Sequence, residues 1–318
     1  MNDVLQAYYS YCLKADLQSA IQSLQKLNRS GDKELKIFHE KFLARFVNKN
    51  EKENIKCEDD FVKSIIRSYR AYYREALLQP KKLLNHNAIL SKDLKRIMFN
   101  EGVKFSTVAS FEKLEKILER EFHKRGFLAL FGTVKPFRSL MIWKKESFKI
   151  FNVSLPEKKQ KVKVIFLEQF LELGWMHYAT FGKYYVGGWA RKDALYCVKQ
   201  AYKIDSPTFN IHYLSHEAQH FSDYKSFPKL IQIDLEYRAK LAELALARSP
   251  KKFLNKLTSE AKKDKNMPHS FAAYKILDGL TDATLPTKIR REAIGLLLQH
   301  SSALKKHGSK KVRTVLLD

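Results

Sequence analysis

Turn-forming residues are scarce in this chain of 318 residues, which contains only 11 Gly and 8 Pro. All-β sandwiches need many turns, and nucleotide-binding loops need several glycines close together. The composition therefore argues against both of these folds. Because 45% of the residues are hydrophobic, the chain has enough apolar material to form a core. A prior of about 150 residues per domain predicts about two domains.

The chain is strongly basic, with 59 Lys and Arg against 34 Asp and Glu and a formal net charge of +25. Such a charge excludes a strongly basic partner and favours nucleic acid, an anionic membrane surface or an acidic substrate without choosing among them. The segment 305–313 is especially rich in Lys and Arg. We expect this tail to be solvated, and a binding role is the alternative.

The cysteines and the amino terminus bear on localisation. The three cysteines, Cys12, Cys57 and Cys197, are odd in number and lack the paired spacing of a disulfide framework or a cysteine zinc site. The amino terminus lacks a basic segment followed by a long apolar one, so we expect no signal peptide. No run approaches ~18 apolar residues, so we expect no transmembrane segment. These features predict a cytoplasmic protein.

The periodicity of apolar residues divides the chain near residue 125. The first part, 1–125, has helical spacing throughout, and residues 8–27 read as a helical hairpin or, less well, as a tetratricopeptide unit without a second copy. The second part, 126–318, mixes strands with helices, so we predict an α+β fold with these two domains. We expect helices at 34–48, 60–78, 109–124, 211–224, 228–248, 269–280 and 287–305, and strands at 147–153, 160–166 and 194–198.

Strands 147–153 and 160–166 alternate polar and apolar residues around a turn at 156–159, which predicts an antiparallel hairpin with Lys161 and Lys163 facing solvent. A stretch rich in aromatic residues and glycine follows it. There, the segment Val186-Gly187-Gly188-Trp189 has two interpretations that the sequence leaves open. It is a hairpin turn, or it is an edge strand or loop bordering a cleft.

The segment His216-Glu217-Ala218-Gln219-His220 is the motif with the clearest chemistry. On a helix, residues four apart share a face, so His216 and His220 can bind one zinc ion while Glu217 reaches a water molecule beside it. About 0.03 matches to this pattern are expected by chance from the composition. The alternative is a pair of surface histidines.

Zinc needs a third protein ligand, and the following helix offers Glu236 and Glu243. If the two helices are antiparallel with a turn between Tyr224 and Pro228, His216 and Glu236 each lie eight residues from the turn, at the same level. Glu243 overshoots this level by roughly 10 Å at 1.5 Å per residue, and Asp223 follows His220 too closely to fold back. Glu236 is therefore the preferred third ligand and Glu243 the alternative.

These residues resemble the active site of the zincin metallopeptidases, in the branch whose third ligand is a glutamate, the gluzincins. The resemblance covers about 211–245, and the segment from Gly174 to Glu243 also resembles a family of uncharacterised bacterial zincin-like proteins. The resemblance implies a zincin-like domain with one zinc ion bound by His216, His220 and Glu236 and with Glu217 as general base. Position 240, where that branch often has an aspartate that orients a histidine, is Lys here. Asp223, Asp234 or Glu243 are the candidates for that role.

Peptide hydrolysis also needs a donor for the oxyanion that forms at the scissile carbonyl. The candidates are His269, Tyr237 and Tyr274. For His269 the alternative is an exposed residue at the start of a helix, and for Tyr237 it is a place in the core. In zincins an edge strand before the metal-binding helix pairs with the substrate, so the resemblance implies this role for the segment 186–189.

The sequence thus predicts a zinc-dependent peptidase acting on a peptide or protein, with an acidic partner possible. The alternative is a basic protein that binds nucleic acid or an acidic partner and whose metal site is structural or vestigial. Glu217 favours the enzyme, because a structural site has no need of a base beside its ligands.

Overall fold

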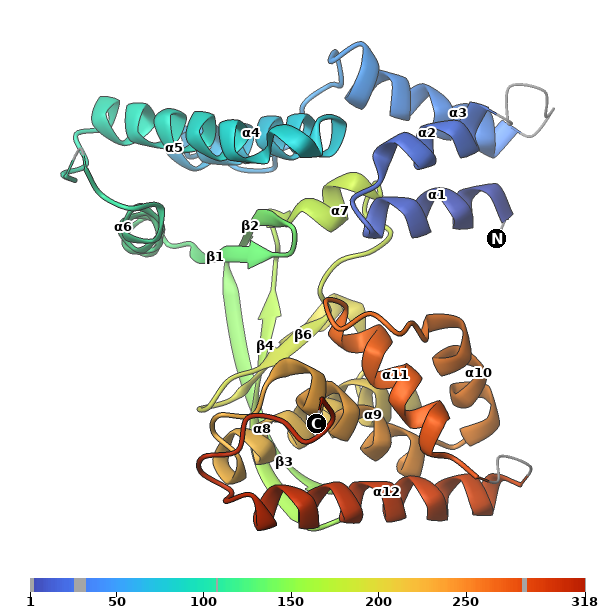
Figure 1. Cartoon of the computed structure of the whole chain (residues 1–318). Helices are drawn as coiled ribbons and strands as arrows, with labels where there is room; N and C mark the ends of the chain where they lie inside the picture. Colours follow the sequence, from blue (N-terminus) through green and yellow to red (C-terminus); the bar gives the residue numbers. More distant parts are fainter. Residues whose placement is uncertain (1–2, 26–32, 107, 282–284, 318) are drawn as a thin grey trace. The chain divides into compact units, whose positions relative to one another are not determined.

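The computed structural model describes residues 3–25, 33–106, 108–281 and 285–317 (Figure 1). The chain has an α+β fold with two small sheets. Its contacts divide it into two compact units. The first unit comprises Met1–Lys145 and Glu168–Val186, and the second comprises Glu146–Leu167 and Gly187–Asp318. Each unit is described by itself below.

Helices make up most of the first unit. Asp59 caps one of them, the helix α4, by accepting a hydrogen bond of 2.9 Å from the amide of Val62. Ser110 does the same for α6 through the amide of Lys113. The helical segments are α1 (Asp3–Leu13), α2 (Leu17–Gln25), α3 (Lys33–Phe42), the π-helical η2 (Leu43–Val47), α4 (Asp60–Leu78), the 3₁₀ turn η3 (Pro80–Lys82), α5 (Leu83–Asn100), α6 (Phe111–Lys124) and α7 (Trp175–Ala179).

A three-stranded antiparallel sheet completes the first unit, in the order β1 (Leu128–Val134), β2 (Phe137–Trp143) and β5 (Glu172–Leu173). The core of this unit is rich in aromatic side chains, and α4 contributes Tyr69 and Tyr73, which are fully buried. The Tyr73 hydroxyl accepts a hydrogen bond of 2.9 Å from the amide of Leu140, which ties α4 to β2.

The second unit contains a four-stranded sheet in the order β3 (Lys145–Ser154), β4 (Lys159–Glu168), β7 (Leu195–Val198) and β6 (Gly188–Ala190). β4 and β7 are parallel, whereas β6 and β7 are antiparallel, so β6 lies at an edge. One face is apolar, with Val164 and Leu195 fully buried in the same cluster as Phe209 and Tyr213. This packing holds the sheet against the segment that precedes the metal-motif helix.

The helix α9 (Gln232–Leu246) occupies the centre of the second unit, and all its residues from Ile233 to Ala245 are buried. It packs against α8 (His216–Ser226), α11 (Pro268–Gly279) and α12 (Pro286–Lys306). The other helical segments are the 3₁₀ turn η4 (Lys199–Ala201), the π-helical η5 (Thr208–Ser215) and α10 (Pro250–Glu260). Proline occupies the first position of α10, α11 and α12, where its missing N–H costs no helical hydrogen bond.

Most of the expected elements are confirmed. The hairpin of strands 147–153 and 160–166 corresponds to β3 and β4, and Lys161 and Lys163 are exposed as expected. The helices α5 and α10 and the β1–β2 hairpin are present without having been predicted. The predicted domain boundary at residue 125 coincides with the end of α6, whereas the first compact unit continues through β1 and β2 to Lys145.

The carboxyl-terminal tail differs from the expectation. The prediction that the segment 305–313 is solvated is wrong at the end of that segment. There Val312 is buried, and the carbonyl of Arg313 accepts a hydrogen bond of 2.8 Å from the amide of Ile231. These contacts attach the tail to the start of α9. Within the described ranges, no helix has both the length and the apolar character needed to cross a membrane.

Candidate metal centre

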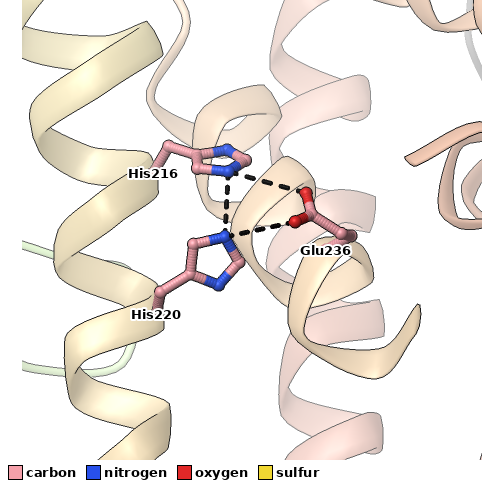
Figure 2. Close-up of side chains that lie close together, drawn as sticks. All are labelled: His216, His220 and Glu236. Atoms are coloured by element: carbon pink, nitrogen blue, oxygen red, sulfur yellow. Dashed lines mark hydrogen bonds and ion pairs between the residues drawn. The ribbon is translucent and has the colours of Figure 1, made fainter. Parts of the chain in front are cut away.

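Two histidines of α8 and one glutamate of α9 converge in the second unit (Figure 2). His216 and His220 lie one turn apart with their rings nearly perpendicular, and their Nε2 atoms are 3.0 Å apart. Glu236 faces them from α9, with Oε2 3.6 Å from Nε2 of His216 and Oε1 3.6 Å from Nε2 of His220. The structure therefore brings together the three residues that the sequence predicted as ligands.

The antiparallel course of α8 and α9 explains this convergence. Glu236, near the start of α9, faces His216 and His220, whereas Glu243, two turns later, faces His216 and the earlier residue His212. Later residues of α9 thus face earlier residues of α8, as in any antiparallel pair of helices. This is the arrangement on which the choice of Glu236 depended.

Glu243 fixes the orientation of His216. Its Oε1 lies 2.6 Å from Nδ1 of His216, and its Oε2 lies 2.8 Å from Nδ1 of His212. The carboxylate can only accept, so Nδ1 of His216 carries a proton, and Nε2, which faces His220 and Glu236, is the atom that can bind a metal once it has lost its proton. Glu243 therefore lies behind a ligand histidine, in the orienting role, and not among the three converging groups.

The charges in this group are strongly coupled. Burial lowers the pKa of His216, but Glu243 and the other nearby carboxylates outweigh it and raise that pKa to about 9. Burial raises the pKa of Glu243, but His216 and His212 lower it to about 2. Burial, together with the charge of His216, lowers the pKa of His220 to about 3. One imidazolium thus sits among ionised carboxylates at neutral pH, in the place that a metal cation would fill.

Glu217 follows His216 on α8 and is partly buried. Burial raises its pKa to about 7, with a contribution from the negative charges of Glu236 and Glu243 that His216 partly offsets. A carboxyl group with a pKa near neutrality is suited to accept and release a proton at physiological pH. This pKa suits the role of general base that the sequence predicts for Glu217.

Two of the three predicted oxyanion donors, His269 and Tyr237, have different surroundings. His269 lies in the first turn of α11, is 65% exposed, and places Nδ1 2.8 Å from Oε2 of Glu236. Tyr237 is buried in the core that α9 shares with α11, and its ring packs on His300 at 5.1 Å. The structure therefore brings His269, but not Tyr237, to the histidine–glutamate group.

Asp223 and Asp234 do not contact the ligand histidines. Asp223 is buried beside the guanidinium of Arg238, 2.9 Å from its Nε. Asp234 lies 3.1 Å from Nε2 of His300 and accepts a hydrogen bond of 2.7 Å from Thr314 in the tail. Both carboxylates therefore hold the helices and the tail of the second unit together. Of the three candidates for orienting a ligand, only Glu243 touches one.

The segment 186–189 is in part an edge strand. β6 begins at Gly188. The turn from β6 to β7 lies later in the chain, where the amide of Arg191 donates a hydrogen bond to the carbonyl of Ala194. The interpretation of Gly187-Gly188 as a hairpin turn is therefore wrong. No described strand pairs with the other edge of β6. A Cβ at Gly188 would lie 2.4 Å from the Tyr213 ring, so the glycine lets β6 approach η5, just before the metal-motif helix.

Not all of that segment belongs to this unit. Gly187, Gly188 and Trp189 lie in the second unit, and the Trp189 ring stacks on Tyr196 of β7 at 5.5 Å. Val186 ends the first unit. Of this segment, only the residues from Gly187 onward belong to the same unit as the metal-motif helix.

Sequence reasoning missed two members of the group. His212, in η5, shares Glu243 with His216, and its ring also stacks on Phe253 at 5.3 Å. Tyr224 stacks on His220 at 6.3 Å from the next turn of α8. The four-residue spacing from 212 to 216, 220 and 224 is the signal that could have found them, because such residues share one helical face.

The donor set suits a zinc ion. Two imidazole nitrogens and a carboxylate oxygen lie within 4.8 Å of one another, and the hydrogen bond from Nδ1 of His216 to Glu243 leaves Nε2 of that ring to face the other two groups. Three protein ligands of these types leave a fourth position open, which is the pattern of catalytic rather than structural zinc. The residues present therefore fit the ion.

Comparisons with models of known protein families, with curated proteins and with solved structures find no match to this chain. The functional argument therefore depends on the residues of the site.

Proposed function

We propose that this protein is a zinc-dependent peptidase whose second unit is a zincin-like domain. The observation that supports this proposal best is the convergence of His216, His220 and Glu236, with the partly buried Glu217 directly after the first ligand. The order of a sheet followed by the metal-motif helix agrees with the zincin layout. Because His216 is oriented by Glu243, the site is built to hold a metal in one geometry.

His216, His220 and Glu236 would hold the zinc ion, and the chemistry it would supply there is that of a Lewis acid, which polarises a water molecule and a carbonyl group. Glu217 takes the proton from the attacking water and delivers it to the leaving amine. His269, exposed and adjacent to Glu236, donates a hydrogen bond to the oxyanion. The edge strand β6 pairs with the extended backbone of the peptide.

The test combines metal analysis with cleavage of a peptide library. Purified protein is expected to hold about one zinc per chain, as a site with three protein ligands requires. Glu217→Gln should keep the zinc and lose activity by ~10²- to 10⁴-fold, the usual contribution of a general base. His216→Ala should lose both zinc and activity.

Glu260→Gln is the matched control. Glu260 pairs with Lys240 of α9 at 2.9 Å, outside the converging group, so this variant removes a carboxylate near the same helix without touching a ligand. It should keep full activity. Undiminished cleavage by Glu217→Gln would refute the assigned base, and a wild-type protein that binds no zinc would refute the site.

A further inference from the structure

The first unit contains a pocket of about 630 Å³ whose walls come from α4, from α7 and from the segment that begins at the end of α3. Seven of the residues lining it are Lys or Arg, and three are Glu. These residues belong to the first unit throughout, so the pocket is independent of the candidate metal centre. An excess of positive charge in a concave site attracts anions and raises their local concentration.

Two segments supply most of the cations. Lys41 lies in α3, Arg45 in the π-helical η2 and Lys49 just after it, whereas Arg70 and Arg74 lie four residues apart on α4. Residues four apart share an α-helical face, so α4 presents its two arginines to the pocket, and the other three cations line it from the segment that begins at the end of α3.

Some of these cations are already occupied. Arg67 makes two hydrogen bonds to Glu53, and Arg45 makes two to Glu51 and a third to the carbonyl of Tyr178. The guanidinium of Arg45 also covers the Phe181 ring at 4.0 Å. These two arginines therefore form the wall of the pocket and have few donors left for a ligand.

Other cations keep donors available. Arg70 uses Nε for Glu172, and Arg74 uses Nε for Glu75 at 3.4 Å. Among the described residues, the Nη atoms of these two arginines bond no protein acceptor, and no carboxylate lies within 4.0 Å of Lys41 or Lys52. The Nη atoms of two guanidinium groups and the ammonium groups of two lysines thus keep donors available around one pocket.

The arginine row is held in place by buried groups. The Glu172 side chain is 1% exposed and lies 2.8 Å from Nε of Arg70, which fixes that guanidinium at the pocket wall. His177 also lines the pocket, and burial, together with the charges of Arg70 and Arg45, lowers its pKa to about 4. A neutral imidazole adds a hydrogen-bonding group without adding charge.

We propose that this pocket binds the phosphate group of a phosphorylated ligand. A carboxylate offers one charge and two oxygens, whereas a phosphate offers up to two charges and three terminal oxygens. Paired guanidinium donors match these oxygens in a bidentate geometry, and the ammonium groups of Lys41 and Lys52 neutralise the second charge. The number of cations with donors available therefore fits the dianion better than a single carboxylate.

The test is calorimetric titration of the full chain with inorganic pyrophosphate at constant ionic strength, with citrate as the carboxylate comparison. We expect saturable binding near one equivalent, with pyrophosphate preferred to citrate. Arg74→Gln should weaken binding by ~10-fold or more, because a hydrogen bond to a charged group is lost. Arg74→Lys should recover only part of that loss, since it restores the charge and not the paired donors.

Lys41→Gln/Lys52→Gln tests the ammonium groups, and both residues are exposed, so the fold should not depend on them. Lys92→Gln/Lys113→Gln removes the same charge from exposed positions outside the pocket and should change affinity less than twofold. Equal losses in both pairs, no saturable binding, or a preference for citrate or a glutamate-rich peptide would overturn the proposal. So would binding of an oligonucleotide with which pyrophosphate does not compete.

Discussion

Replacing Glu243 by glutamine should weaken zinc binding by ~10- to 100-fold, the usual cost of losing a group that orients a ligand histidine. At 1.36 kcal/mol per factor of ten, this loss corresponds to about 1.4–2.7 kcal/mol. The reason lies in the two hydrogen bonds of this carboxylate, which accepts from Nδ1 of His216 and from Nδ1 of His212. The two donors meet different oxygens of the carboxylate, Oε1 and Oε2, and glutamine replaces one of these oxygens by an NH2 donor, so only one of the two contacts keeps an acceptor. If His216 moves its proton to Nε2, the lone pair for the metal is lost.

The assay is competition for zinc between the protein and a chromophoric chelator at pH 7.5, with a thermal melt of each metal-free variant to check the fold. Glu260→Gln is the matched control and should bind zinc as the wild type does. In the double variant Glu243→Gln/His212→Ala the side chain of residue 212 no longer offers a donor that competes with His216 for the amide oxygen, so part of the affinity should return.

Wild-type affinity in a folded Glu243→Gln protein would refute the reasoning, because the tautomer of His216 would then not depend on Glu243. An equal loss in Glu260→Gln would show that the effect comes from the net charge around α9 and not from the orientation of a ligand.

Three further predictions concern stability and catalysis. Burial raises the pKa of Glu115 to about 7, so its contribution to stability is present below its ordinary pKa of 4.5 and is lost as the pH rises toward 7. Glu115→Gln should therefore stabilise the protein by about 3 kcal/mol at pH 8 and by little at pH 4.5, as urea unfolding would measure. Gly188→Ala should destabilise by about 1–3 kcal/mol because its Cβ would overlap the Tyr213 ring, whereas Gly295→Ala, with open space inside α12, should stabilise by about 1 kcal/mol; thermal melts would check both signs. His269→Gln should lower kcat on a cleaved peptide by ~10²-fold with little change in zinc content, and an unchanged kcat would remove His269 from the mechanism.

The ligand group was predictable because its rules are local. Four-residue spacing places His216 and His220 on one face, and one tight turn fixes the level of Glu236 on an antiparallel neighbour. No such rule reaches His269, which comes to Glu236 only because α11 packs on α9. For a related reason, the sequence did not predict that Glu243 contacts both His216 and His212. The rise per residue gives the level of a side chain along a helix, but it does not say which ring nitrogen a carboxylate contacts.

Two of the missed elements, α5 and β2, have patterns that are hard to recognise in the sequence. α5 buries Leu90, Leu94 and Met98 at four-residue spacing, but the exposed Ile89 and Phe99 blur its apolar stripe. In β2, burial continues through the last five residues, so the alternation that identifies a half-buried strand is absent. In both elements, the tertiary packing determines which residues are buried, and the periodicity of apolar residues in the sequence does not show it.

The net charge of +25 conceals two local environments of opposite sign. Around His216 and His220, the carboxylates of Glu217, Glu236 and Glu243 are close enough to influence one another's pKa values. A divalent cation among them would favour the ionised form of Glu217, because an opposite charge lowers a carboxyl pKa. Metal binding and the ionisation of Glu217 are therefore coupled at this centre, so a smaller fraction of Glu217 is ionised at neutral pH in a metal-free preparation than in the holoprotein. The cationic pocket of the first unit follows the opposite logic, since its excess of guanidinium and ammonium groups makes an anion, and not a cation, the group that completes it.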